Sequence, residues 1–177
     1  SGSLTVSPSS VIGGSTKTIT FTYTAVGDVT NGFIKLSVPT GWTAPSSIIG
    51  AAGGVTAALA SGSTGSISVA SASGLDIIVP INSLGANNAI DISYSNATSP
   101  TEVSSYTFTA ATRDFSGSYV SLASGVTVNT TISLISIDPA IVVSPEVGQE
   151  LEVKIKIIGG SNVAGYQFTL EFDDTAL

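Results

Sequence analysis

The stretch T-K-T-I-T-F-T-Y-T, residues 16–24, decides the fold class of this chain. Its side chains alternate between two faces, because successive residues of a β-strand point to opposite sides. Five threonines fall on one face. The other face carries Lys17, Ile19, Phe21 and Tyr23. A period of two is typical of a half-buried strand, so this stretch predicts a central strand of an all-β domain.

Similar alternation recurs along the first 129 residues, at 33–38, 66–69, 75–79, 89–94, 106–112 and 126–129. Turn-forming residues separate these segments, for example the pairs Gly13-Gly14 and Asn31-Gly32. No stretch shows a helical period. Short strands at this spacing predict a β-sandwich of two sheets over residues 1–129. Residues 46–66 are rich in Ala, Gly and Ser, and we expect them to form a long surface excursion.

Composition narrows the classes of function. Of the 177 residues, 42% are hydrophobic and only 10% are charged, and the net charge is -7. Cys and His are absent, which removes disulfides, thiolate catalysis, the usual general base and the commonest zinc ligand. The acidic balance also lacks the basic surface that binds phosphates. We therefore expect neither an enzyme nor a nucleic-acid-binding protein.

The same composition indicates an extracellular protein. A chain without Cys, Met or His suits an oxidising exterior, where no redox machinery protects side chains. No apolar run approaches the ~20 residues of a membrane span, and no signal segment opens the sequence. We predict a secreted protein of the cell surface that is not inserted in a membrane. A signal peptide and any anchor are expected outside the sequence shown.

A second unit is predicted over residues 130–177. The first unit opens with an extended segment that reaches Pro8, a Gly13-Gly14 turn and an alternating strand. The same order returns at 136–139, 147–148 and 151–158. Proline cannot donate to a sheet ladder, so it belongs at an edge or at a switch between sheets. The echo predicts sandwiches in series.

The second unit is short for a domain and ends in an apolar strand face. A unit of this length without a disulfide or metal seldom stabilises itself, and its exposed strand edges would recruit other chains. Either the sequence ends inside a domain, or another polypeptide supplies the missing strands. That protein partner could be a second copy of this chain. The predicted assembly face consists of Tyr166, Phe168, Leu170 and Phe172.

Residues 163–177, V-A-G-Y-Q-F-T-L-E-F-D-D-T-A-L, and 147–155, V-G-Q-E-L-E-V-K-I, resemble the first third of bacterial cohesin-like domains. The match covers roughly the last quarter of the chain. The resemblance implies a jelly-roll-like sandwich of secreted scaffolds that binds dockerin modules. Asp174 stands where that family often has proline. Most strands of a dockerin-binding face are absent, so the resemblance implies an incomplete cohesin-like unit.

Residues 1–129 resemble the immunoglobulin-like repeats of large bacterial surface proteins. The resemblance rests on L-T-V-S-P-S-S-V at 4–11, residues 18–24, V-P-T-G-W-T-A-P at 38–45 and Y-T-F-T-A at 106–110. It implies a spacer or adhesive module without an active site. We therefore predict a structural module of a surface layer, fibre or adhesin. The alternative is a cohesin-like binding module that recognises dockerin or carbohydrate.

One candidate metal site lies near the end of the sequence. Glu171, Asp173 and Asp174 offer the hard oxygen ligands that calcium prefers. Their spacing lacks the D-x-D-x-D-G pattern of a specific calcium loop. The alternative is a solvated strand end. No cofactor other than calcium is predicted from the sequence.

Two lysines and three acids raise the possibility of covalent or catalytic chemistry. Lys17 or Lys35 could face the core and form an isopeptide bond with an asparagine, since a buried amine is nucleophilic. The alternative is an edge-protecting or outward-reaching lysine. Glycosidases place two carboxylates across a bond. Nothing in the spacing of Asp76, Asp91 and Glu102 marks such a pair.

Three further features each allow two interpretations. Asn96 and Asn129 begin N-x-T patterns that match glycosylation acceptors, although such matches also arise by chance in a Thr-rich chain. The pair Asp138-Pro139 resembles self-processing bonds, but the same dipeptide also opens strands. Trp42 is the single tryptophan. Its ring could stack on a sugar, or it could plug one end of the sandwich.

Overall fold

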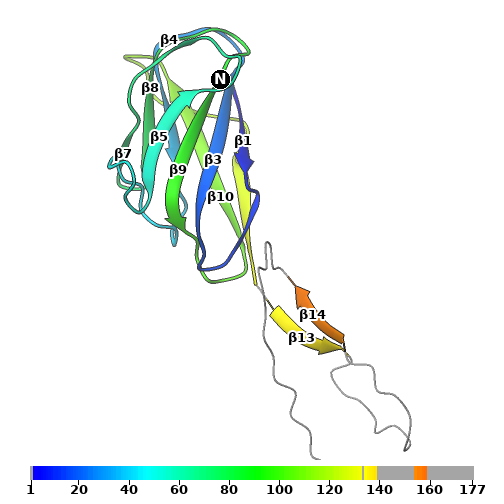
Figure 1. Cartoon of the computed structure of the whole chain (residues 1–177). Helices are drawn as coiled ribbons and strands as arrows, with labels where there is room; N and C mark the ends of the chain where they lie inside the picture. The colour runs from blue at the N-terminus through cyan, green and yellow to red at the C-terminus, as the bar shows by residue number, and fades with distance from the viewer. Residues whose placement is uncertain (1, 133, 139–153, 159–177) are drawn as a thin grey trace, which may run out of the picture. The chain divides into compact units, whose positions relative to one another are not determined.

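The computed structural model describes residues 2–132, 134–138 and 154–158. The chain divides into two compact units, Ser1–Thr131 and Ile132–Leu177. Every regular element in the described ranges is a β-strand, which confirms the all-β prediction (Figure 1). None of the described residues belongs to a helix that could cross a membrane.

The first unit is a sandwich of two sheets. Sheet 1 has the order β1 (Gly2–Ser7), β3 (Thr16–Ala25), β9 (Ala89–Thr98) and β5 (Gly54–Leu59), with every neighbouring pair antiparallel. Sheet 2 has the order β2 (Ser10–Ile12), β12 (Val126–Thr131), β10 (Ser105–Arg113), β4 (Val29–Ser37), β8 (Asp76–Leu84) and β6 (Gly65–Ile67). Beside this path, β11 (Val120–Ser121) pairs with β10, and β7 (Ser71–Ser73) pairs with β8.

The strand order is that of an immunoglobulin sandwich with an insertion. In that fold the first, second, fifth and fourth strands form one sheet, and the third, sixth and seventh form the other. Here β1, β3, β9 and β5 take the first set of places, and β4, β10 and β12 take the second. The strands β6, β7 and β8 are inserted between β5 and β9, and they extend sheet 2 beyond β4.

The chain changes sheets at Pro8, as the sequence predicts for a proline after an entry strand. β1 pairs with β3 in sheet 1, and after Pro8 the chain continues as β2 in sheet 2. The Ser7–Pro8 peptide bond is cis. β2 then runs parallel to β12, with Ser10 opposite Asn129. The second strand of the unit, β2, is therefore paired with its last strand, β12.

The core lies between the two sheets. The inward residues of β3, Ile19, Phe21 and Tyr23, are fully buried, as the alternation predicts. The ring of Phe21 packs against that of Phe108 from the opposite sheet, with centroids 4.8 Å apart. Lys17, expected on the same face, is exposed. The register of β3 against β9 shifts between Lys17 and Ile19, which takes the lysine out of the inward series.

The prediction of a surface excursion over residues 46–66 is wrong. This segment contains β5, an edge strand of sheet 1, and Val55 within it is 1% exposed. Glycine permits this placement, since a Cβ on Gly53 would lie 2.2 Å from the carbonyl oxygen of Ala44. Glycine and alanine give little hydrophobic alternation. The position of β5 depends on the close approach of Gly53 and Gly54 to the backbone of the preceding loop. An alternating pattern of large apolar residues does not indicate such an approach.

The second unit is described over two strands. β13 (Leu134–Asp138) pairs antiparallel with β14 (Lys154–Ile158), and Asp138 lies opposite Lys154. The predicted assembly face (Tyr166, Phe168, Leu170 and Phe172) and the candidate calcium ligands (Glu171, Asp173 and Asp174) lie outside the described residues.

Candidate binding surface

The two strand acids do not form a catalytic pair. Asp76 lies on the outer face of sheet 2, where it accepts a hydrogen bond of 2.5 Å from the Ser37 hydroxyl. Asp91 lies on the outer face of sheet 1, where it accepts one of 2.6 Å from Thr22. Two carboxylates on opposite outer faces cannot act across one bond. Glu102 is exposed in the loop between β9 and β10.

Neither candidate lysine enters the core, which the isopeptide hypothesis requires. Lys35 is on the outer face of sheet 2, where its Nζ lies 3.6 Å from an Asp76 carboxylate oxygen. Its Nζ also lies 5.0 Å from the centroid of the Tyr119 ring. Lys17 is exposed at the beginning of β3. Both lysines therefore fit the outward-facing alternative.

The two asparagines of the N-x-T patterns are exposed, and both make hydrogen bonds. Asn96 donates from Nδ2 to the Gly50 carbonyl at 3.0 Å, and Asn129 accepts from the Ser105 hydroxyl at 2.7 Å. Glycosylation stays a prediction. Asp138 ends β13, and Pro139 lies outside the described residues.

Trp42 plugs one end of the sandwich, and its ring is not available to stack on a sugar. The residue is 5% exposed. Its ring meets that of Phe108 at 5.3 Å and that of Tyr106 at 6.2 Å, both edge to face. Such pairs add to the stabilisation from burial. Of the two interpretations of Trp42, the structural one is confirmed.

We call this end of the sandwich the exit end, because β12 ends there at Thr131. Buried polar groups hold it together. The Thr130 hydroxyl, 2% exposed, donates to the Glu102 carbonyl and accepts the Ser104 N–H at 2.9 Å. The buried Ser99 hydroxyl donates to the Ile12 carbonyl at 3.0 Å. These bonds join the loop between β9 and β10 to the last strand and to the end of β2.

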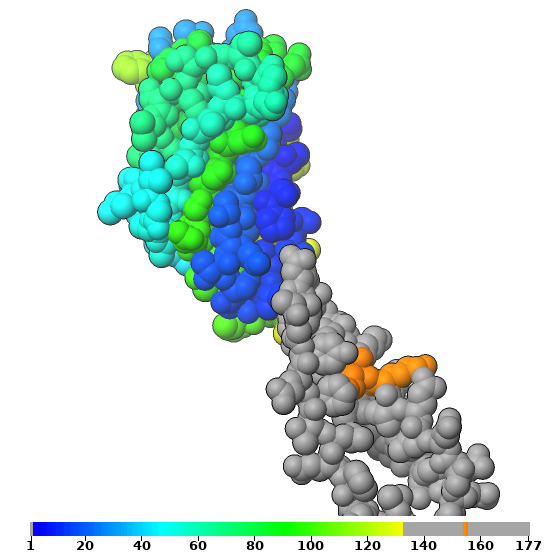
Figure 2. Space-filling view, viewed as in Figure 1, coloured from blue at the N-terminus to red at the C-terminus, as the bar shows by residue number. Residues whose placement is uncertain are grey.

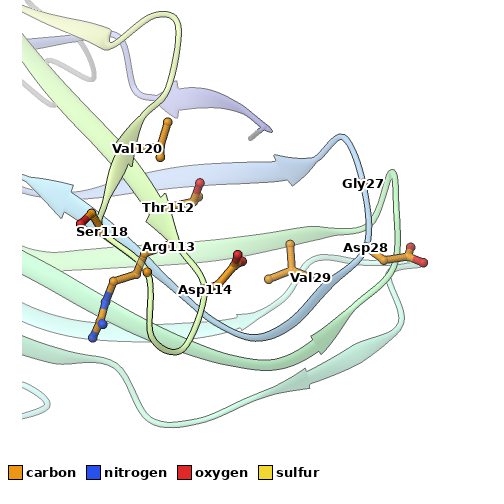
Figure 3. Close-up of a pocket in the computed structure, with 9 residues that line it drawn as sticks. Gly27, Asp28, Val29, Thr112, Arg113, Asp114, Ser118 and Val120 are labelled. Atoms are coloured by element: carbon orange, nitrogen blue, oxygen red, sulfur yellow. The ribbon is translucent and has the colours of Figure 1, made fainter.

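The opposite end, which we call the open end, carries a hollow of about 290 Å³. One wall is the turn between β3 and β4, and the other is the end of β10 with the hairpin that follows it (Figure 3). Figure 3 shows the side chain of Asp114 next to that of Val29, and the side chain of Thr112 on the side of Val120. Ser118 and Val120 line the hairpin side.

A cluster of cations and aromatic rings fastens the hairpin to sheet 2. The Arg113 guanidinium lies 4.3 Å from the centroid of Phe33 and 5.0 Å from that of Tyr119. Arg113 also donates from Nη1 to the Phe115 carbonyl at 3.4 Å. The guanidinium is thus stacked on the outer face of the sheet, and Figure 3 shows it pointing away from the hollow.

Apolar side chains stand exposed around the hollow. Phe115, at the tip of the hairpin, is 73% exposed, and Val26 and Val120 are also exposed. The strand and turn patterns of the sequence did not predict this exposed apolar surface. Its signal is the stretch R-D-F-S-G-S, residues 113–118, which combines two charges, a ring and small turn residues between two strands. A turn that carries an aromatic residue and charges is a candidate for contact as well as for connection.

The outer face of sheet 1 offers no comparable feature. Figure 2 shows β1, β3 and β9 side by side on this face. Its side chains are small and mostly hydroxylated, as on β3, where Thr20, Thr22 and Thr24 alternate with the core residues. Within the described ranges, no group of three or more His, Cys, Asp or Glu could hold a metal ion.

Comparisons with known proteins found similarity to solved structures. No protein-family model matches the chain, and no curated protein matches it. One similar solved structure is BslA, described as a bacterial hydrophobin, which is 23% identical with a TM-score of 0.44. The alignment covers 73% of this chain and 98% of that chain. The strand pairing, rather than this likeness, defines the fold described above.

Proposed function

We propose that this chain is a structural module of an extracellular bacterial surface protein or fibre, without catalytic activity. The observation that carries the proposal is the path of the chain through the first unit. Gly2 pairs with Ala25 at the open end, whereas β12 ends with Thr131 opposite Ile12 at the exit end. A chain that enters and leaves at opposite ends suits modules joined in series.

The terminal strands are arranged to resist a pull along this path. β1 and β2 both run from the open end to the exit end, and β12 runs the same way beside β2. Tension would draw β2 toward the open end and β12 toward the exit end. Their hydrogen bonds, such as Asn129 N–H to the Ser9 carbonyl at 2.9 Å and Gly13 N–H to the Thr131 carbonyl at 2.8 Å, would be loaded together. Breaking several bonds at once requires more force than breaking them one after another.

Single-molecule force spectroscopy tests this proposal. The chain has no native Cys, so an engineered thiol provides a unique attachment point. One handle is placed at the C-terminus, and the other either at the N-terminus or at Thr101→Cys in an exposed exit-end loop. The first geometry shears β12 against β2. The second peels β12 from β10 at the Ser105–Asn129 pair.

We expect the first unit to need a several-fold higher unfolding force in the shear geometry. The peeling geometry is the matched control, because the protein differs by one exposed residue. Equal unfolding forces in the two geometries would contradict the proposal that the pairing of β2 with β12 resists tension.

For the second unit, we propose that strands from another chain complete its sheet by β-augmentation. The support is the apolar alternation of residues 166–172, which predicts a strand face that another sheet covers. Light scattering after size-exclusion chromatography, with and without calcium, tests the idea. We expect oligomers that grow with concentration and that a peptide of the missing strands blocks. A monomer at all concentrations would exclude this mode of assembly.

A second candidate function is a binding module for carbohydrate, favoured by the hollow at the open end. Recognition of dockerin stays a prediction from the cohesin-like resemblance, because the residues that carry it are mostly outside the described ranges.

A further inference from the structure

The hollow at the open end has the size and the chemistry of a small ligand site. Ligand pockets begin at about 300 Å³, so a hollow of about 290 Å³ has room for one sugar ring but not for an oligosaccharide. Its walls come from two loops held by the rigid sandwich. Loops in this position on a rigid scaffold carry the binding residues of many proteins.

Hydrogen-bond acceptors dominate the polar lining. Figure 3 shows the Asp114 side chain facing the hollow, with the hydroxyl-bearing side chains of Thr112 and Ser118 also in its walls. Among the described residues, no cation pairs with the Asp114 carboxylate; the ion pair in those ranges joins Lys35 to Asp76. The hollow thus presents an unpaired carboxylate to an incoming ligand.

The apolar part of the lining suits a ring with C–H groups. Val29 lines the hollow from the β3–β4 turn and Val120 lines it from the hairpin side. Phe115 stands exposed on the hairpin. A pyranose has such a face, and its hydroxyl groups are the donors that a carboxylate and two hydroxyls can accept. Charge-assisted hydrogen bonds of this kind are the stronger ones.

We propose that this hollow at the open end binds one residue of a neutral sugar. Acidic sugars are disfavoured, because Asp114 faces the hollow while the Arg113 guanidinium is stacked on Phe33 and Tyr119. The inference deepens the carbohydrate-binding candidate, and it does not depend on whether the terminal strands bear load.

Titration of the whole ¹⁵N-labelled chain by NMR tests this proposal. The probes are the methyl glycosides of glucose, mannose and galactose, each neutral, with glucuronate and calcium chloride for comparison. We expect at least one neutral glycoside to shift the amides of residues 27–29 and 112–120. Asp114→Ala should weaken its binding about tenfold or more, since a hydrogen bond to a charged group is lost. Ser118→Ala should weaken it less.

The control is Asp91→Ala, an outward-facing acid on sheet 1, which should leave the affinity unchanged. Three results would overturn the proposal: no shift at the open end with any neutral glycoside, shifts only with glucuronate or calcium, or equal binding after Asp114→Ala. The exit end carries a second hollow, of about 570 Å³, which Pro100, Glu102 and Tyr106 help to line. Shifts confined to that second hollow would overturn the proposal as well. None of these results bears on the force measurement, so the two proposals fail separately.

Discussion

The two ends of the sandwich differ in how they use the same kinds of residue. At the exit end an aromatic residue, Trp42, is buried against two rings, and the hydroxyl of Thr130 is buried with hydrogen-bond partners. At the open end an aromatic residue, Phe115, stands in solvent, and an acid faces a hollow without a partner among the described residues. The exit end buries these groups in its core, although its loops also expose Val103 and line a second hollow of about 570 Å³. The open end leaves its ring and its acid in contact with solvent.

This difference teaches where stability and contact are located in one small fold. The buried hydroxyls of Ser99 and Thr130 have hydrogen-bond partners and rigidify the place where the last strand leaves the unit. Exposed apolar and unpaired polar groups contribute little to the free energy of unfolding, so they are free to serve recognition. If stability and contact are separated in this way, substitutions at the exit end should lower the free energy of unfolding more than substitutions at the open end.

Trp42→Ala should lower the free energy of unfolding by about 3–5 kcal/mol, because it empties a space between Tyr106 and Phe108. Phe115→Ala is the matched change at the open end and should stay within about 0.5 kcal/mol. Urea unfolding followed by far-UV circular dichroism, a signal that does not depend on the single tryptophan, measures the stability of both variants. Similar losses for the two variants would break the comparison between the ends.

Thr130→Val should cost about 1–3 kcal/mol, since it removes a buried hydroxyl that bonds both the Ser104 N–H and the Glu102 carbonyl. Thr127→Val serves as the control, because it makes the same change in an exposed residue of β12. The difference between their unfolding free energies isolates the buried hydroxyl. If both variants were as stable as the natural chain, the polar network would not contribute to the exit end.

Residues 16–24 show which parts of such a fold can be predicted from sequence. The alternation of residues 16–24 correctly predicts the burial of Ile19, Phe21 and Tyr23, because period two follows directly from strand geometry. Pro8 correctly marks a switch between sheets, because proline lacks the donor that a ladder needs. Both inferences rest on local chemistry.

What the sequence does not predict depends on contacts between distant residues. The sequence pattern does not predict β5, because the strand depends on Gly53 and Gly54, which lie close to backbone atoms of the preceding loop. Lys17 was placed on the wrong face because a register shift depends on the partner strand. The hollow was missed since Val29 and Asp114, which belong to different loops, meet only in the folded sandwich.

Alkaline pH should destabilise the sandwich through its buried tyrosines. Burial raises the pKa of Tyr94 and of Tyr23 above the usual value of 10.0. The folded state therefore keeps these protons at a pH where the unfolded state releases them. Stability is full below pH 10 and falls as pH rises above it, by at most about 1.4 kcal/mol per pH unit for each tyrosine.

Tyr94→Phe, which removes a hydroxyl that donates to the Thr43 carbonyl at the exit end, should reduce the alkaline slope. Tyr119→Phe is the control, since Tyr119 is only partly buried on the outer face of the sandwich. Unfolding midpoints in urea between pH 8 and about pH 11 measure the slope. An unchanged slope for Tyr94→Phe would show that this tyrosine does not cause the dependence.

The smallest effect is expected at the open end, where Arg113 joins the hairpin to the sheet. Arg113→Lys keeps the charge but loses the planar group that stacks on Phe33 and Tyr119. Because cation–π contacts at exposed sites contribute about 0.5–1 kcal/mol, the global stability should change by no more than that. Hydrogen exchange should instead quicken at the amides of residues 114–119, while those around Thr130 stay protected. Equal acceleration at both ends would mean that the open end is coupled to the packed end, so that its surface could not change without a loss of stability.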